Sequence, residues 1–145
     1  MPAPIKAVID TSVMVSVAFA KEGLARELRD MIADGSFILC TTKEILAELY
    51  RVLHYPRISK QFKPELEDIE QFMGMVLEKA LITEGSYTIR KIKDDPTDDM
   101  FLACAMEAEA DYIVSRDPHL RNVKRFRGIE IIDVTTFVEK AKGEP

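Results

Sequence analysis

Four acidic side chains stand at positions from which they could share one metal ion: Asp10, Glu48, Asp98 and Asp117. Asp10 and Asp117 each close a short apolar run, AVID and YIVSRD, of the kind that forms a buried strand. The carboxyl ends of parallel strands meet at one edge of a sheet, so acids placed there can converge although they are far apart in sequence. Two unit charges about 4 Å apart repel by roughly 4 kcal/mol at an effective dielectric near 20. A divalent cation would relieve that repulsion.

The chemistry that such a site favours is metal-assisted hydrolysis. Hard oxygen ligands suit Mg²⁺ or Mn²⁺, whereas zinc prefers imidazole and thiolate. The two histidines, His54 and His119, stand in no metal-binding spacing, and we expect surface or turn positions for both. A bound cation could activate water for in-line attack on a phosphodiester and neutralise charge on the leaving oxygen. The sequence has neither a GxSxG elbow nor a P-loop, so no covalent or nucleotide-cradling alternative is indicated.

Asp10 and Asp117 also have a simpler interpretation, because an acid that follows a strand often only caps the next helix. Their occurrence together with the other two acids favours a shared site. Hydroxyl groups lie beside them at Thr11, Ser12 and Ser115, where they could orient a carboxylate or bind a phosphate oxygen.

Helical periodicity selects Glu48 over its neighbour Glu44. The apolar stripe of this helix consists of Ile45, Leu46, Leu49, Val52 and Leu53. At about 100° per residue, Glu48 falls roughly 100° from the centre of the stripe and Glu44 roughly 140°. We therefore expect Glu48 at the border of the buried face and Glu44 on the surface.

Periodicity does not choose between Asp98 and Asp99, because the helix that they open is apolar almost all round. Acids in the first turn also stabilise a helix through its dipole, by about 0.3–1 kcal/mol each. From the residues alone, a structural role for both is as good an interpretation as metal binding.

The elements that must position these acids alternate between strand-like and helix-like segments. Strands are expected at 5–9, 37–40, 87–92, 112–115 and 129–133, and helices at 24–35, 41–55, 63–81, 95–110 and 135–142. Gly35 is the expected end of the first helix, Pro64 lies near the first turn of the third, and Asp95 and Pro96 open the fourth. This order predicts an α/β domain with a mainly parallel sheet that spans residues 1–145.

Composition is that of an ordinary globular domain, with 145 residues, 47% hydrophobic and 31% charged. No apolar run is long enough for a membrane span and the N-terminus does not resemble a signal peptide, so we expect a cytoplasmic protein with no membrane partner. Cys40 and Cys104 lie in apolar surroundings and are expected to be reduced core thiols.

The net charge of −5 argues against a protein that coats nucleic acid, although not against an enzyme that meets phosphates through a metal. Two basic clusters, Arg90-Lys91-Lys93 and Arg121-Lys124-Arg125-Arg127, are interpreted first as solvated loop surface and alternatively as phosphate contacts.

The chain resembles a PIN domain in four stretches: IKAVIDTSVMVSVAF, ILAELYRVL, DPTDDMFLACAMEAEADYIVSRDPHL and IEIIDVTTFV. The order and spacing of these motifs carry the resemblance, and the branch that includes VapC-type toxins is the most similar. The resemblance implies a three-layer α/β/α fold and a Mg²⁺- or Mn²⁺-dependent ribonuclease that cuts RNA. It also implies a homodimer and an antitoxin that would lay a helix across the site.

The resemblance assigns the family's acids to this sequence one by one. Its first aspartate falls on Asp10, its helix glutamate on Glu48, the aspartate that opens the later helix on Asp98, and the last aspartate on Asp117. Many members carry asparagine two residues after the first aspartate, where this chain has Ser12. Serine keeps a hydroxyl but loses the amide, so a contact to the metal site is in question.

Two other classes of function compete with the nuclease. A phospho-acceptor domain would need paired acids after the first strand and a lysine after a late strand, whereas this chain has one acid, Asp10, and the run Ser115-Arg116-Asp117. A PIN-like module that binds RNA or protein without catalysis would be favoured by loss of one of the acids, and all four are present.

Overall fold

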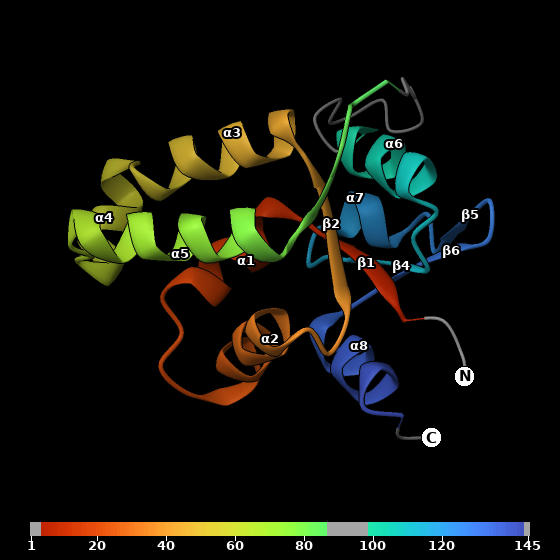
Figure 1. The fold of residues 1–145 in the computed structure, drawn as a ribbon, viewed down its shortest axis with the longest axis horizontal. Helices are drawn as coiled ribbons and strands as arrows, with labels where there is room; N and C mark the ends of the chain where they lie inside the picture. Colours follow the sequence, from red (N-terminus) through yellow and green to blue (C-terminus); the bar gives the residue numbers. More distant parts are fainter. Residues whose placement is uncertain (1–3, 87–98, 144–145) are drawn as a thin grey trace.

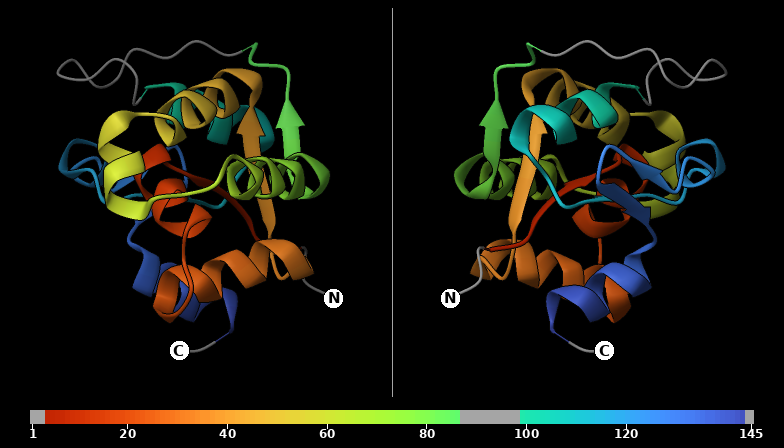
Figure 2. Two further views of the ribbon diagram at one scale, coloured as in Figure 1. Left: turned by 90° about the vertical axis from the view of Figure 1, so that its left-hand side faces the viewer. Right: turned by 90° about the vertical axis from the view of Figure 1, so that its right-hand side faces the viewer.

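The computed structural model describes residues 4–86 and 99–143, and its centre is a mainly parallel sheet (Figure 1). The strands are β1 (Lys6–Ile9), β2 (Ile38–Thr42), β3 (Leu81–Thr83), β4 (Tyr112–Val114), β5 (Arg125–Phe126) and β6 (Ile129–Ile132). Their order is β3-β2-β1-β4-β6-β5, and β5 is antiparallel to β6 while the other neighbours are parallel. The arrows of β2 and β3 point the same way in Figure 2. The predicted sheet type is confirmed.

Helices cover both faces of this sheet. They are α1 (Thr11–Ala18), α2 (Gly23–Asp34), α3 (Lys43–Leu53), α4 (Pro56–Phe62), α5 (Leu66–Lys79), α6 (Asp99–Ala108), α7 (Pro118–Arg121) and α8 (Val134–Ala141). Side chains alternate along each strand, so Ala7 and Ile9 join one apolar cluster with α1, α2, α5 and α8. Val8 joins a second cluster with α6 and Leu120 of α7. Two cores on opposite faces make the three-layer α/β/α arrangement that the sequence predicts.

Local signals place the helix that carries Glu48. β2 runs on through Thr42, whose side chain accepts a hydrogen bond from the Ile45 N–H at 3.1 Å and caps α3. Because Thr42 is both the last residue of a strand and the cap of a helix, α3 begins directly at the carboxyl edge of the sheet. Gly35 ends α2 as predicted, with φ of 77° in the left-handed region.

Several elements differ from the sequence prediction. The helix α1 is missing from the prediction because it is apolar nearly all round, so it shows no stripe. The helix α4 begins at Pro56 and, with seven residues, is too short to show a period. Pro64 lies before the Glu65 cap of α5, outside its first turn, and the end of the predicted third helix becomes the three-residue strand β3. The predicted strand at 87–92, with Asp95 and Pro96, lies outside the described residues.

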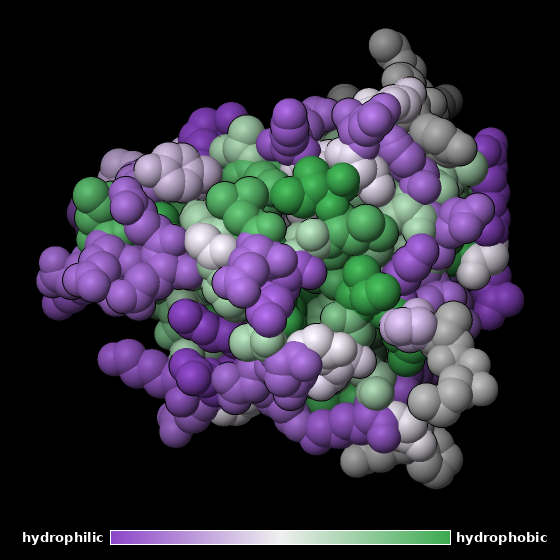
Figure 3. Space-filling model, in the orientation of Figure 1, coloured by the Kyte–Doolittle hydropathy of each residue, from purple (hydrophilic) through white to green (hydrophobic). Residues whose placement is uncertain are grey.

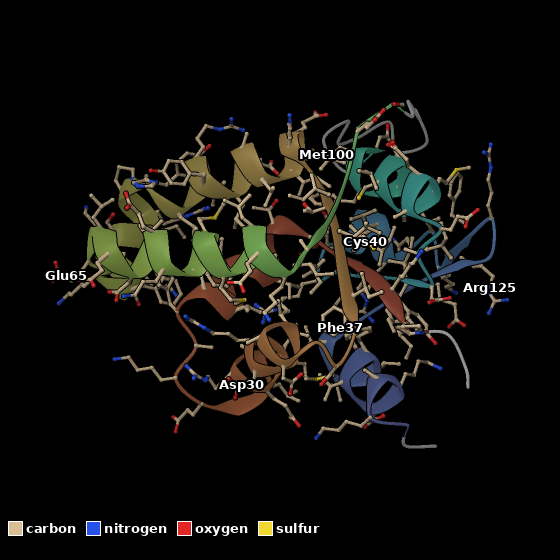
Figure 4. All side chains as sticks on the ribbon, in the orientation of Figure 1. Asp30, Phe37, Cys40, Glu65, Met100 and Arg125 are labelled. Atoms are coloured by element: carbon tan, nitrogen blue, oxygen red, sulfur yellow. The ribbon has the colours of Figure 1, made fainter. Side chains whose placement is uncertain are left out.

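Both cysteines are buried and free, as predicted, and Cys40 lies on β2 within the body of the molecule (Figure 4). Burial raises the pKa of Cys40 to about 11 and that of Cys104 to about 12, so both stay protonated thiols at neutral pH. Over the part of the chain that the structure describes, no helix has the length and apolar character needed to cross a membrane.

Candidate active site

Asp10 is a carboxylate buried at the carboxyl end of β1. Its side chain is 3% exposed. Its Oδ1 accepts a hydrogen bond from the Val13 N–H at 2.9 Å and so caps α1, while its own N–H donates to the Val114 carbonyl at 3.0 Å. Asp10 is therefore the predicted helix cap, and it is held at the junction of β1 with its neighbour β4.

Ser115 joins Asp10 to the end of β4. The two strands are parallel and in register, with Ile9 beside Val114. The fully buried Ser115 hydroxyl donates to Oδ2 of Asp10 and accepts from the Asp117 N–H at 2.9 Å. The Asp10 carboxylate is thus linked through one serine to the backbone of Asp117.

Burial is the largest influence on the Asp10 carboxyl, and it raises the pKa of that group above its ordinary value. The nearby charge of Asp117 acts in the same direction. Hydrogen bonds from the Ser115 hydroxyl and from the backbone of Val13 and Arg116 oppose the rise in pKa without cancelling it. A cation beside Asp10 would offset the cost of this buried charge.

Glu48 approaches the same region from α3. The Thr11 hydroxyl, at the start of α1, donates to Oε2 of Glu48 at 2.6 Å. Glu48 is half-buried and Glu44 is exposed, which confirms the border position predicted from helical geometry. Since Thr11 follows Asp10 directly, Glu48 is linked to the Asp10 end of β1.

Buried polar side chains gather at this edge of the sheet. Among the described residues they are Asp10, Thr41, Thr42, Asp99 and Ser115. They stand at the carboxyl ends of β1, β2 and β4 and at the start of α6. Thr41 and Thr42 were not among the predicted site residues, although the sequence shows two threonines directly after the strand predicted at 37–40. Periodicity left Asp98 and Asp99 open, and the resemblance to the PIN family then selected Asp98. Asp99 is 7% exposed in the structure.

The predicted site residues are only partly brought together. Ser115 links the Asp10 carboxylate to the backbone N–H of Asp117, Thr11 next to Asp10 holds Glu48, and Asp98 lies outside the described residues. In residues 4–86 and 99–143, no group of three or more His, Cys, Asp or Glu side chains is close enough to hold a metal ion. Ser12 is exposed and lines a neighbouring cavity instead.

The side chains at this edge of the sheet are of the chemical kind that a hard divalent cation binds. Asp10, Glu48 and Asp117 carry carboxylates, and Thr11 and Ser115 carry hydroxyls. Zinc would favour nitrogen or sulfur ligands, and both cysteines are core thiols of high pKa.

We predict that Thr11→Val lowers the affinity for Mn²⁺ by about tenfold, the lower end of the range for residues that orient metal ligands. Valine keeps the shape of threonine but removes the hydroxyl that holds Glu48. Calorimetric titration of purified variants with Mn²⁺ measures this, with Thr135→Val on an exposed position of α8 as the matched control. Equal affinities for the two variants would show that Thr11 does not position Glu48.

The protein is thus an α/β protein with an open, mainly parallel sheet. Its candidate site lies at the carboxyl edge of this sheet, where strands end and helices begin. Comparison with known families then identifies the chain. The model of the PIN domain family matches residues 6–119, and the chain belongs to this family. PIN domains are generally nucleases.

Solved structures share the fold at low sequence identity. One is the crystal structure of PAE2754 from Pyrobaculum aerophilum, with a TM-score of 0.64, 13% identity and coverage of 97% of this chain and 91% of that one. Another is VapBC2 from Rickettsia felis, bound to a DNA fragment from its promoter, with a TM-score of 0.57, 14% identity and coverage of 88% and 97%. No curated protein matches the sequence.

Proposed function

We propose that this chain is a Mg²⁺- or Mn²⁺-dependent endoribonuclease that hydrolyses RNA phosphodiester bonds and acts as the toxin of a toxin–antitoxin pair. The observation that carries the proposal is the buried Asp10 carboxylate, tied through Ser115 to Asp117 at the carboxyl edge of the sheet. Membership of a family whose members are generally nucleases supports the same activity.

In this proposal Asp10, Asp98 and Asp117 hold the cation, and Glu48 binds it directly or through water. Divalent ions are typical of PIN nucleases, and a bound ion supplies an activated water and charge neutralisation at the phosphate. The protein's part is to fix the carboxylates: Ser115 holds Oδ2 of Asp10, and Thr11 holds Oε2 of Glu48. Ser12, where many relatives carry asparagine, contributes only a hydroxyl near the site.

An antitoxin partner is part of the proposal, supported by the fold shared with VapBC2. The surface also offers apolar side chains to a protein partner, either an antitoxin or a second copy in a homodimer. Three large apolar side chains are exposed on α5 and β3: Leu77, Leu81 and Ile82. Figure 3 shows an apolar area at the centre of this face of the molecule. An amphipathic helix is the kind of segment that binds such a surface.

A PIN-like module that binds RNA or protein without cutting it is the second candidate. The observation that favours it is the lack, among the described side chains, of a group of three potential metal ligands. A measurement of metal binding distinguishes the nuclease from the non-catalytic module, because such a module does not require a metal ion.

The test is cleavage of labelled single-stranded RNA with Mg²⁺ or Mn²⁺, with and without EDTA. We expect the protein to cut the RNA, and we expect EDTA to abolish this cutting. The substitutions Asp98→Asn and Asp117→Asn should each reduce the rate of cutting by about a hundredfold or more. Cutting that persists in EDTA would refute metal dependence. A protein that neither cuts several RNAs nor binds Mn²⁺ in calorimetry would be the non-catalytic module.

A further inference from the structure

A cavity of about 520 Å³ opens next to the candidate active site, between α1 and α4. Its lining combines polar and apolar side chains. The polar lining consists of Thr11, Ser12, Ser16, Arg57, Gln61 and Arg116, and the apolar lining of Val15, Val52, Ile58 and Phe62. The cavity is within the size range of sites that bind small organic groups, but it is more polar than most of them.

The charge of this cavity is opposite to that of the protein. The chain as a whole carries −5, yet the described residues that line the cavity include two arginines and no carboxylate. Both arginines, Arg57 and Arg116, are exposed, so their charges reach the open side. Arginine binds phosphate through paired N–H donors, and hydroxyl and amide groups add further donors.

The cavity is connected directly to the acids. Thr11 lines it and also donates to Glu48. Arg116 lies between Ser115, which holds Asp10, and Asp117, and its Nη1 donates to the Ser16 hydroxyl at 3.0 Å across the cavity wall. A phosphodiester chain that leaves the acids along α1 therefore meets these arginine side chains next.

A second cavity of about 530 Å³ continues the basic surface away from the acids. Gln61 and Phe62 line both cavities, and Phe62 is fixed by stacking on Phe19 with ring centroids 4.8 Å apart. The basic side chains of the second cavity are Lys21, Arg26, Arg29 and Lys63, against one acid, Asp68. Positive charge thus extends along one side of the acidic site.

We propose that the cavity between α1 and α4 binds the single-stranded RNA on one side of the bond to be cut, with Arg57 and Arg116 on a backbone phosphate and the apolar lining residues against the adjoining nucleoside. This inference rests on the proposed function, because it extends the same site. A positively charged groove beside apolar surface is how proteins bind a single strand without reading its sequence.

The test measures binding without cleavage. Fluorescence anisotropy in EDTA would follow a labelled single-stranded RNA of about twelve nucleotides, a length within the range that single-strand-binding OB folds cover. We expect Arg57→Gln and Arg116→Gln each to raise Kd by about tenfold and to lower the salt slope by about 0.7, the contribution of one phosphate contact on a single strand. Arg57→Lys keeps the charge and should recover part of the affinity.

Arg125→Gln is the control, since it removes the same charge from an exposed arginine, which here pairs with Glu130 at 3.2 Å. Because Arg125 belongs to the basic cluster at 121–127, the control also tests the alternative that this cluster contacts the phosphates. Arg125 lies on β5, at the opposite end of the molecule from Glu65 and the adjoining α4 (Figure 4). We expect it to change Kd by less than about twofold. Thermal melting of each variant checks that Arg116→Gln, which also loses its bond to Ser16, remains folded.

Equal Kd values for the two cavity variants and Arg125→Gln would overturn the inference. The proposed function can fail separately. Wild-type protein that binds RNA through the two arginines but does not cut it with Mn²⁺ would support the inference and refute the nuclease. If both cavity variants cut RNA with an unchanged KM, the proposed nuclease activity would be supported. The same result would show that the cavity does not bind the substrate.

Discussion

Asp10→Asn is expected to lower RNA cleavage by about 10²–10³-fold and, in metal-free buffer at pH 7, to raise the Tm by a few degrees. Loss of activity follows because asparagine is a poor ligand for Mg²⁺ or Mn²⁺ in place of a carboxylate. The gain in stability follows because wild-type Asp10 is a charge buried to 3% exposure. A substitution that lowers activity and raises stability identifies a residue that is retained for function at a cost in stability.

The pH dependence of this stability difference has a definite sign. Burial raises the pKa of Asp10 in the folded protein above its ordinary value of 3.8. Between the unfolded and folded pKa the native state binds more protons, so wild-type stability falls as pH rises through the folded pKa. The advantage of Asp10→Asn should therefore be complete above the folded pKa and should vanish as pH falls below 3.8. Thermal melting of both proteins across pH measures it.

Asp10→Ala is the control for the capping role of this residue. Asparagine caps a helix about as well as aspartate and can keep the bond from the Val13 N–H, whereas alanine loses it at a cost of about 1 kcal/mol. Mn²⁺ should raise the Tm of wild type and leave that of Asp10→Asn unchanged. An Asp10→Asn protein that melts lower than wild type and still responds to Mn²⁺ would contradict a metal-binding role.

The sequence predicts this site best where an acid ends a strand. Asp10 and Asp117 follow apolar runs that could only be core strands, and parallel pairing of β1 with β4 then brings them to one edge. Glu48 could be chosen because α3 has a clear apolar stripe, and its half-buried position agrees. The positions of Asp10 and Asp117 follow from the strands that they end, and the direction of Glu48 follows from the periodic pattern of its helix.

The parts that the sequence missed lack such a pattern. α1 is buried over most of its surface, so its residues show no helical stripe, although Asp10 was visible as a cap. Ser115 was predicted to stand near a carboxylate, yet its link from Asp10 to the Asp117 N–H depends on tertiary pairing of two strands. The cavity between α1 and α4 arises from elements distant in sequence, and neither arginine lies in a basic cluster of the chain.

Phe137→Ala should destabilise the protein by about 3–5 kcal/mol, a large part of the 5–15 kcal/mol typical of a domain. Phe137 is fully buried and makes edge contacts with two aromatic rings, Phe37 at 4.9 Å and Tyr112 at 5.9 Å between centroids. Because α8 also buries Val134 and Val138 on the same face, the loss would leave a cavity that the sheet cannot close. Unfolding in urea measures the change, and Leu66→Ala, at a position 60% exposed, should stay within about 0.5 kcal/mol of wild type.

Phe137→Ala also tests whether the geometry of the site depends on core packing at the other end of the strands. Phe37 precedes β2 and Tyr112 begins β4, so Phe137 packs at the amino ends of the strands, whereas Asp10 and Ser115 follow the carboxyl ends. At a temperature well below its lowered Tm, the Phe137→Ala protein should cut RNA with wild-type kcat/KM. If instead a folded Phe137→Ala protein is inactive, the positions of the carboxylates depend on how α8 packs against the far edge of the sheet. The positions of the strand ends would then not be sufficient to place the carboxylates of the site.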